Sequence, residues 1–177
     1  MKIIKYFIES LFIIFLLIVF KILGLKFSSN LGSIVGGLLG PFFRSKNKII
    51  SNIKKALPEA EQKDIEIITK KMWKNYGRIL SEYVFIKNFR NSKDEKFFSV
   101  EGQEILNGIK NTNEPVIFIS GHFNNFELMA MQIEKSGINL AAIYRPLNNV
   151  FLNKIMERIR KKYICQKQIK KGRSGTR

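Results

Sequence analysis

The apolar run near the N-terminus constrains the fold of this chain more than any other feature. Residues 6–25 are apolar except for Glu9, Ser10 and Lys21. A helix that crosses a lipid bilayer needs about 20 predominantly apolar residues, and this run approaches that length. We therefore predict an uncleaved membrane anchor helix at residues 1–26.

A cleaved secretory signal peptide and a helix lying in the membrane interface are the alternatives for this run. Lys21 and Lys26 follow the apolar residues, and no small-x-small site follows closely, which argues against cleavage. An interfacial helix would turn Glu9 and Lys21 toward the head groups. Basic residues are more numerous after the run than before it, so the positive-inside bias predicts a cytoplasmic location for the body of the protein.

Charge and cysteine content limit the partners and the chemistry. The chain of 177 residues contains 31 Lys plus Arg against 14 Asp plus Glu, a formal net charge of +17, which favours anionic partners. Because Cys165 is the only cysteine and there is one histidine, we predict no internal disulfide and no metal site built from these residue types. The membrane anchor and the missing aromatic platforms argue against nucleic acid as a partner.

Hydrophobic periodicity predicts an α/β domain over residues 27–177. The expected helices have apolar residues at three- and four-residue spacings, and they cover residues 27–43 (lying against the membrane surface), 49–56, 64–87, 103–110, 124–135 and 150–163. The expected strands are short runs rich in β-branched or aromatic residues, at 97–100, 115–120 and 139–144. In the long helix, Trp73 and Tyr76 are expected to lie in the core.

The last two strands and the helix between them predict a βαβ unit at the centre of a mainly parallel sheet. The segment after the last helix, residues 167–177, is basic and contains Gly and Ser, so we expect no closing helix or strand there. A sheet of two or three strands is too small to cover its helices. The domain is therefore expected to be incomplete at its C-terminus.

The only histidine stands where the predicted strand 115–120 turns into a helix, and a carboxylate follows it five residues later. His122 and Glu127 suit general-base catalysis, because an imidazole accepts a proton from an attacking hydroxyl while a carboxylate orients the ring. Gly121 allows a sharp turn, and the amides of Asn124 and Asn125 are suitable donors for an oxyanion. The alternative is a structural histidine that caps the strand.

A second polar cluster follows the next predicted strand and contains Tyr144, Arg145 and Asn149. Adjacent parallel strands end at the same edge of a sheet, so Arg145 is expected beside the His122 turn. There its guanidinium would bind a phosphate or a carboxylate with two hydrogen bonds. The alternative is a surface arginine that pairs with a local acid.

These two motifs resemble those of the bacterial lipid A biosynthesis acyltransferases, which are late acyltransferases of the glycerolipid acyltransferase superfamily. The matching segments are Gly121–Glu127, Tyr144–Pro146 and Asn149, with further similarity at Asn52–Pro58, Asn75–Arg78, Glu82–Tyr83 and Glu101–Gly102. The resemblance implies transfer of a fatty acyl chain from acyl carrier protein, or acyl-coenzyme A, to a hydroxyl of a lipid A precursor in lipopolysaccharide biosynthesis. It also implies the bacterial inner membrane, a single-pass or monotopic attachment, a catalytic part on the cytoplasmic side, and no cofactor.

The resemblance implies roles for individual residues as well. His122 is the base and Glu127 its partner, and the substrate-binding residues are Asn125, Tyr144, Arg145, Asn149 and Arg177. Asn125 departs mildly from the family pattern, which often has Trp there. The family continues past the end of this chain, so a truncated, inactive remnant is one expectation.

Two further alternatives stay open. A lysophospholipid acyltransferase normally has Asp where Glu127 stands. A non-catalytic membrane-surface protein would bind anionic lipids through the basic residues near the C-terminus, namely Lys161, Lys162, Lys167, Lys170 and Lys171.

Overall fold

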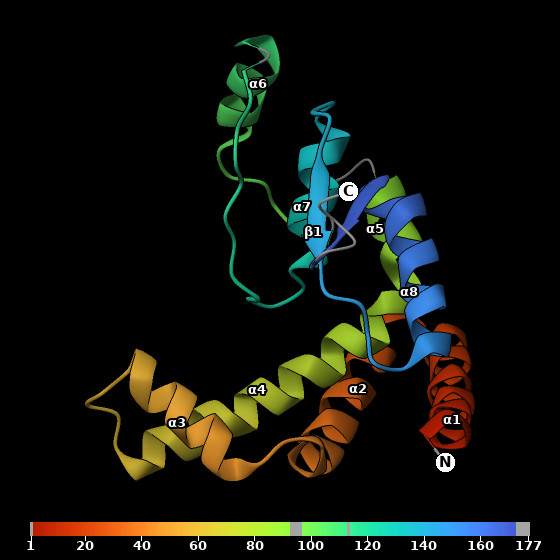
Figure 1. Cartoon of the computed structure of the whole chain (residues 1–177), viewed down its shortest axis with the longest axis vertical. Helices are drawn as coiled ribbons and strands as arrows, with labels where there is room; N and C mark the ends of the chain where they lie inside the picture. The colour runs from red at the N-terminus through yellow and green to blue at the C-terminus, as the bar shows by residue number, and fades with distance from the viewer. Residues whose placement is uncertain (1, 93–96, 113, 173–177) are drawn as a thin grey trace. The chain divides into compact units, whose positions relative to one another are not determined.

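A computed structural model describes residues 2–92, 97–112 and 114–172 and shows a mostly helical α/β protein (Figure 1). The chain forms two compact units, which we call the helical unit (Leu16–Val84) and the sheet unit (Met1–Phe15 with Phe85–Arg177). The helices of the described residues are α1 (Lys2–Leu23), α2 (Leu25–Leu39), α3 (Lys46–Ala56), α4 (Gln62–Glu82), α5 (Ile86–Asn91), α6 (Gln103–Thr112), α7 (Glu127–Lys135) and α8 (Val150–Tyr163). Short 3₁₀ turns lie at Gly40–Phe43 (η1) and Tyr83–Phe85 (η2), and the strands are β1 (Ala141–Tyr144) and β2 (Lys167–Lys170).

Helix α1 covers the predicted anchor. It contains 22 residues and is, by length and composition, apolar enough to cross a membrane. Most of its large apolar side chains are exposed, including Phe7 and Phe12, whereas Ser10 on its polar side is buried. The helix therefore presents an apolar surface that the protein itself leaves uncovered.

In the helical unit, α2 and α4 pack with their backbones in direct contact. A Cβ atom added to Gly77 would lie 1.9 Å from the carbonyl oxygen of Gly32, and one added to Gly36 would lie 2.5 Å from the carbonyl oxygen of Trp73. Only glycine allows helices to approach this closely. The segment expected to lie against a membrane surface thus packs on α4 along this glycine face, while its Ile34 and Leu38 are exposed.

Helix α4 corresponds to the predicted long helix but ends earlier, at Glu82. Ile65 and Ile79 are buried, as the apolar spacing predicted. The Asp64 carboxylate accepts a hydrogen bond from the Glu61 N–H at 3.3 Å, which satisfies one of the free amides at the start of the helix. The prediction of Tyr76 as a core residue is wrong, because 48% of its surface is exposed.

The sheet unit contains a βαβ arrangement in which the predicted strand 139–144 is confirmed as β1, but its partner is not the strand that the sequence predicted. Strands β1 and β2 pair in parallel, with Tyr144 opposite Lys170, and α8 connects them. The predicted strand 115–120 is wrong: none of residues 114–123, all of which the structure describes, lies in a strand. Ile117 and Ile119 in this segment are 87% and 92% exposed.

Residues 115–120 form no strand because a strand needs a neighbouring strand to accept and donate its backbone hydrogen bonds. The partner of β1 is β2, which forms where no closing strand was expected, so that expectation is wrong as well. The predicted strand 97–100 is also irregular. The helices expected at 103–110 and 150–163 are confirmed as α6 and α8. Gly137, at φ +88°, follows the end of α7. The sequence therefore predicted a parallel pair and one of its two strands, β1, but not the partner strand β2.

The core of the sheet unit lies where α5 packs against α7 and α8. Arg90 on α5 donates to the Glu134 carboxylate of α7 at 2.5 Å and to the Tyr163 carbonyl of α8 at 3.2 Å. Its buried apolar residues come from several elements and are Phe85, Ile86, Phe89, Met131, Ile133, Tyr144, Ile164 and Cys165.

Candidate functional site

His122 lies in the irregular segment that leads from α6 into α7, and its side chain is exposed. Its ring contacts the Phe126 ring, with centroids 4.2 Å apart and planes tilted by 57°. The left-handed residue of this turn is Asn124, with φ 45°. Asparagine adopts this conformation more readily than most residues, so the turn presents the imidazole to solvent just before α7 begins.

Glu127 is the first residue of α7 and is buried, with 5% of its surface exposed. The Arg160 side chain of α8 holds its carboxylate: Nε donates to Oε1 at 2.8 Å, and a terminal nitrogen forms a second, shorter hydrogen bond. The N-terminus of a helix also favours a negative charge. The proposed partner of His122 is therefore fixed in place by a cation from another helix.

Tyr144 ends β1 and is buried beneath α8. Its hydroxyl donates to the Glu157 carboxylate, which also accepts from Asn153 Nδ2 at 2.8 Å and pairs with Lys170 at 3.5 Å. Burial, and then the bond to Glu157, raise the pKa of Tyr144 to about 12, while the same bond lowers the pKa of Glu157. The guanidinium carbon of Arg160 lies 5.8 Å from the centre of the Tyr144 ring, which brings Tyr144 and Glu127 around one cation.

Asn149 caps α8 and ties it to α1. Its Oδ1 accepts from the N–H groups of Phe151 and Leu152 at 3.1 and 3.2 Å. Its Nδ2 donates to the Tyr6 carbonyl at 2.8 Å, and the Ser10 hydroxyl lies 3.0 Å from Oδ1. Asn149, a predicted substrate-binding residue, thus has structural partners on two helices.

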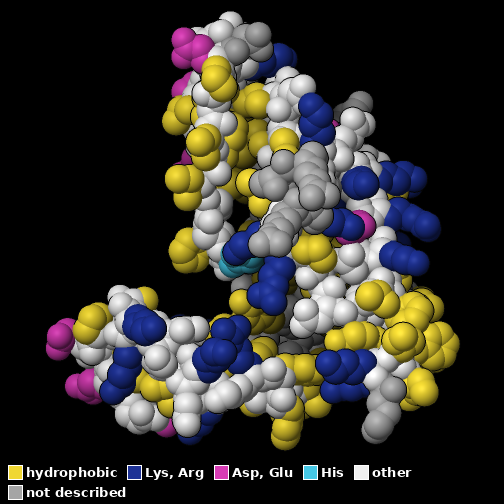
Figure 2. All heavy atoms as spheres, in the orientation of Figure 1, with side chains coloured by type: hydrophobic (Ala, Val, Ile, Leu, Met, Phe, Trp, Pro, Cys, Tyr) yellow, Lys and Arg dark blue, Asp and Glu magenta, His cyan; other side chains and the backbone are white. Residues whose placement is uncertain are grey.

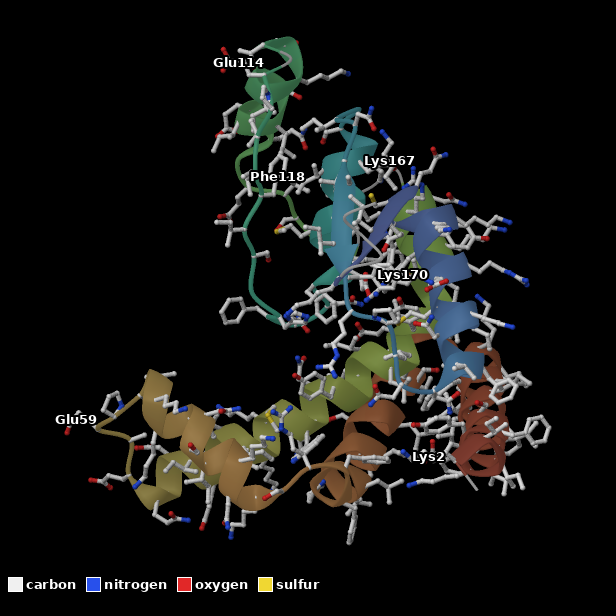
Figure 3. The ribbon with its side chains drawn as sticks, viewed as in Figure 1. Lys2, Glu59, Glu114, Phe118, Lys167 and Lys170 are labelled. Carbon is white, nitrogen blue, oxygen red and sulfur yellow. The ribbon has the colours of Figure 1, made fainter. Side chains whose placement is uncertain are left out.

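The other predicted substrate-binding residues lie in different surroundings. Arg145 directly follows β1 and is exposed, and no hydrogen bond or ion pair engages it within the described part of the chain. Asn125 is buried in the turn before α7, and its backbone carbonyl accepts from the Leu128 N–H at 3.1 Å. Arg177 lies outside the described residues. Figure 3 shows Phe118 on the segment that leads to His122, and Lys167 and Lys170 on β2.

Sequence reasoning missed Glu157 and Arg160 as members of this cluster. A signal for each was present. Glu157 is the only acid in the strongly basic stretch 150–163, and Arg160 continues the row of Leu152 and Met156 at four-residue spacing, which marks an inward-facing position. In the described residues, no group of three or more His, Cys, Asp or Glu side chains is arranged to hold a metal ion.

Comparison with known proteins assigns a family. The family model of the bacterial lipid A biosynthesis acyltransferases matches residues 1–168 of the 177-residue chain. No curated protein and no solved structure matches it. The matched region includes His122, Glu127, Arg145 and Arg160.

Proposed function

The chain belongs to the bacterial lipid A biosynthesis acyltransferase family, as its two motifs predicted, and we propose that it transfers a fatty acyl chain to a hydroxyl of a lipid A precursor. The donor in this proposal is acyl carrier protein, with acyl-coenzyme A as the second candidate. The net charge of +17 supports an acidic donor and a phosphorylated acceptor, because both are attracted to a basic protein.

His122 acts as the general base in this reaction. A ring nitrogen takes the proton of the acceptor hydroxyl while the oxygen attacks the carbonyl carbon of the donor thioester. The carbon–sulfur bond then breaks, and the leaving thiolate takes the proton from the imidazolium. The exposed position of His122 supports this role, because both substrates need access to the ring.

The observation that carries the proposal is the fixed carboxylate of Glu127, five residues after His122, within a matched family region. Glu127 supplies negative charge near the turn that holds the imidazole, and a nearby carboxylate stabilises the imidazolium that forms. The Arg160 pair keeps this carboxylate at the start of α7.

Arg145 binds the anionic group of the acceptor in this proposal. Its exposed guanidinium is suited to a phosphate, which accepts two parallel hydrogen bonds. Asn125 lines the turn beside His122, while Tyr144 and Asn149 support the site through Glu157 and α1. Helix α1 attaches the protein to the inner membrane, with the catalytic part, which contains His122 and Glu127, on the cytoplasmic side.

Acyl transfer by the purified chain in detergent tests the proposal. Labelled acyl carrier protein and a lipid A precursor are supplied, and we expect His122→Ala to lower the rate by at least about 10²-fold, since general-base groups contribute about 10²–10⁴-fold. Lys63→Ala, an exposed position on α4, is the matched control and should keep the wild-type rate.

Three outcomes contradict the proposal. If the His122→Ala variant still transfers the acyl chain at the wild-type rate, His122 is not the general base. If the protein acylates a lysophospholipid but not the lipid A precursor, it is a lysophospholipid acyltransferase. Absence of transfer to either acceptor, from either donor, favours the non-catalytic alternative.

A further inference from the structure

Helix α8 carries a row of exposed cations along one face. Lys154, Arg158, Lys161 and Lys162 are all exposed, and their three- and four-residue spacing places them on the same side of the helix. We call these four residues the α8 stripe. Together with Glu157 they line a shallow depression. The Glu157 carboxylate is already bonded to β1, so the stripe presents an excess of positive charge.

An apolar surface adjoins the stripe. The first half of α1 exposes large apolar side chains, namely Ile4, Phe7, Ile8, Leu11, Phe12 and Phe15. The Phe7 ring meets the Phe151 ring of α8 edge to face, with centroids 5.7 Å apart. Val150, at the start of α8, is 52% exposed. The apolar surface of α1 therefore continues onto the first turn of α8.

The polarity of this surface changes over one helical turn. Figure 2 shows the apolar side chains of α1 next to the Lys and Arg side chains of α8 on the same face of the sheet unit. Lys154 follows Val150 by four positions, which corresponds to about 6 Å along the helix axis. The polar head-group layer of one leaflet is about 5–8 Å thick. The spacing therefore matches the boundary between acyl chains and head groups.

We propose that the α8 stripe binds the anionic head groups of a lipid bilayer while the exposed face of α1 enters the adjacent acyl-chain layer. Each Lys or Arg near an anionic membrane surface strengthens binding by about fivefold. The contacts of Asn149 with Tyr6 and Ser10 hold α1 and α8 together, so the two surfaces can contact the bilayer at the same time. The proposal does not depend on acyl transfer.

An acidic protein is the competing occupant of the stripe. It would use the charge of the stripe alone and would leave the adjoining apolar side chains of α1 uncovered. A bilayer of anionic lipid provides an acyl-chain layer for the apolar face of α1 and, next to it, a layer of anionic head groups for the α8 stripe. The continuity of the apolar surface from Phe7 to Val150 therefore favours lipid.

Vesicle flotation of the full chain tests the proposal. The variant replaces the stripe by Lys154→Gln, Arg158→Gln, Lys161→Gln and Lys162→Gln. The control removes the same number of exposed cations from α3, by Lys46→Gln, Lys48→Gln, Lys54→Gln and Lys55→Gln. We expect the stripe variant to bind phosphatidylglycerol-containing vesicles at least about 20-fold more weakly than the wild type and phosphatidylcholine vesicles equally well, while the control changes by less than about fivefold.

The proposal is overturned if the stripe variant keeps its preference for anionic vesicles, or if the control loses it to the same extent. It is also overturned if the variant still binds anionic vesicles but no longer binds acidic acyl carrier protein, because the stripe is then a protein-binding surface. The double variant Lys154→Gln with Arg158→Gln keeps the test valid if the fourfold variant misfolds by circular dichroism. For the wild type, we expect binding to anionic vesicles to weaken as salt is added. If the affinity does not change with salt concentration, the α8 stripe does not bind the head groups.

Discussion

The Arg160 guanidinium and the Glu127 carboxylate form a buried ion pair that joins α8 to α7. Nε lies 2.8 Å from Oε1, and the two side chains are 13% and 6% exposed. Sequence reasoning had paired Glu127 with His122 alone. The structure shows that the same carboxylate also holds two helices of the sheet unit together, so its replacement affects stability as well as the proposed chemistry.

Replacing Arg160 by Gln is expected to destabilise the protein strongly. The change leaves the buried Glu127 carboxylate without its cation, which typically costs about 3–5 kcal/mol. Thermal unfolding in detergent, followed by circular dichroism, should show a midpoint roughly 10 °C lower. Arg158→Gln is the matched control, because Arg158 is exposed on the same helix, and it should change the free energy of unfolding by less than about 0.5 kcal/mol. Equal effects of the two variants would show that the ion pair contributes nothing.

Tyr144 is expected to make stability depend on pH in the alkaline range. The pKa of the phenol is raised from 10.0 to about 12 in the folded protein, so the unfolded chain loses this proton first as the pH rises. The contribution is complete below pH 10.0 and is lost as the pH rises toward about 12. The slope approaches about 1.4 kcal/mol per pH unit.

Urea unfolding at several pH values measures this contribution by comparison of variants. Tyr144→Phe should lose the additional slope that the wild type shows between these pKa values. Tyr163→Phe, at the end of α8, should keep it. If all three proteins show the same slope, the buried hydroxyl of Tyr144 is not its source.

The close contact between α2 and α4 is expected to leave no room for a side chain at position 77. A Cβ there would lie 1.9 Å from a backbone oxygen, which cannot move aside as a flexible side chain can. Gly77→Leu should lower the free energy of unfolding by about 3 kcal/mol or more. Gly108→Ala in α6 is the control: its Cβ would meet nothing within 4 Å, so it should stabilise the protein by about 0.5–1 kcal/mol. A tolerated leucine at position 77 would disprove the backbone contact.

Two substitutions at Asn149 separate its cap from its bond to α1. Asn149→Ala removes both the cap and the bond to α1. Loss of the cap by itself should lower the free energy of unfolding by about 1 kcal/mol. Asn149→Asp keeps an oxygen for the Phe151 and Leu152 amides but loses the donor to the Tyr6 carbonyl. We expect faster amide exchange in α1 for both variants, and faster exchange in the first turn of α8 for the alanine variant alone. Slow exchange in α1 of both variants would contradict the bond to α1.

The elements that the sequence predicted well are those that local residues determine. Helix α8 has the predicted bounds because its amphipathic spacing and the Asn149 cap are both local. The family was also predictable, because the segment that ends at Glu127 and the residues around Arg145 form specific motifs.

The errors arise where a distant partner decides the structure. Ile117 and Ile119 are typical strand residues, yet β-branched side chains only favour an extended backbone and do not supply a strand to pair with. Lys167–Lys170 has a single apolar residue and gave no strand signal, but it pairs with β1. The spacing of Arg160 marks an inward-facing position but does not identify its partner Glu127, because that contact depends on the position of α7.

The bond between Ser10 and Asn149 also sets an order of events during protein synthesis. The two residues are separated by 139 positions along the chain. A ribosome adds about 5–20 residues per second, so Asn149 is made roughly 7 to 28 s after Ser10. For most of that interval the apolar side chains of α1 have left the ribosome, while α8 has not yet been synthesised. A bilayer or a chaperone therefore meets α1 before its own protein partner does.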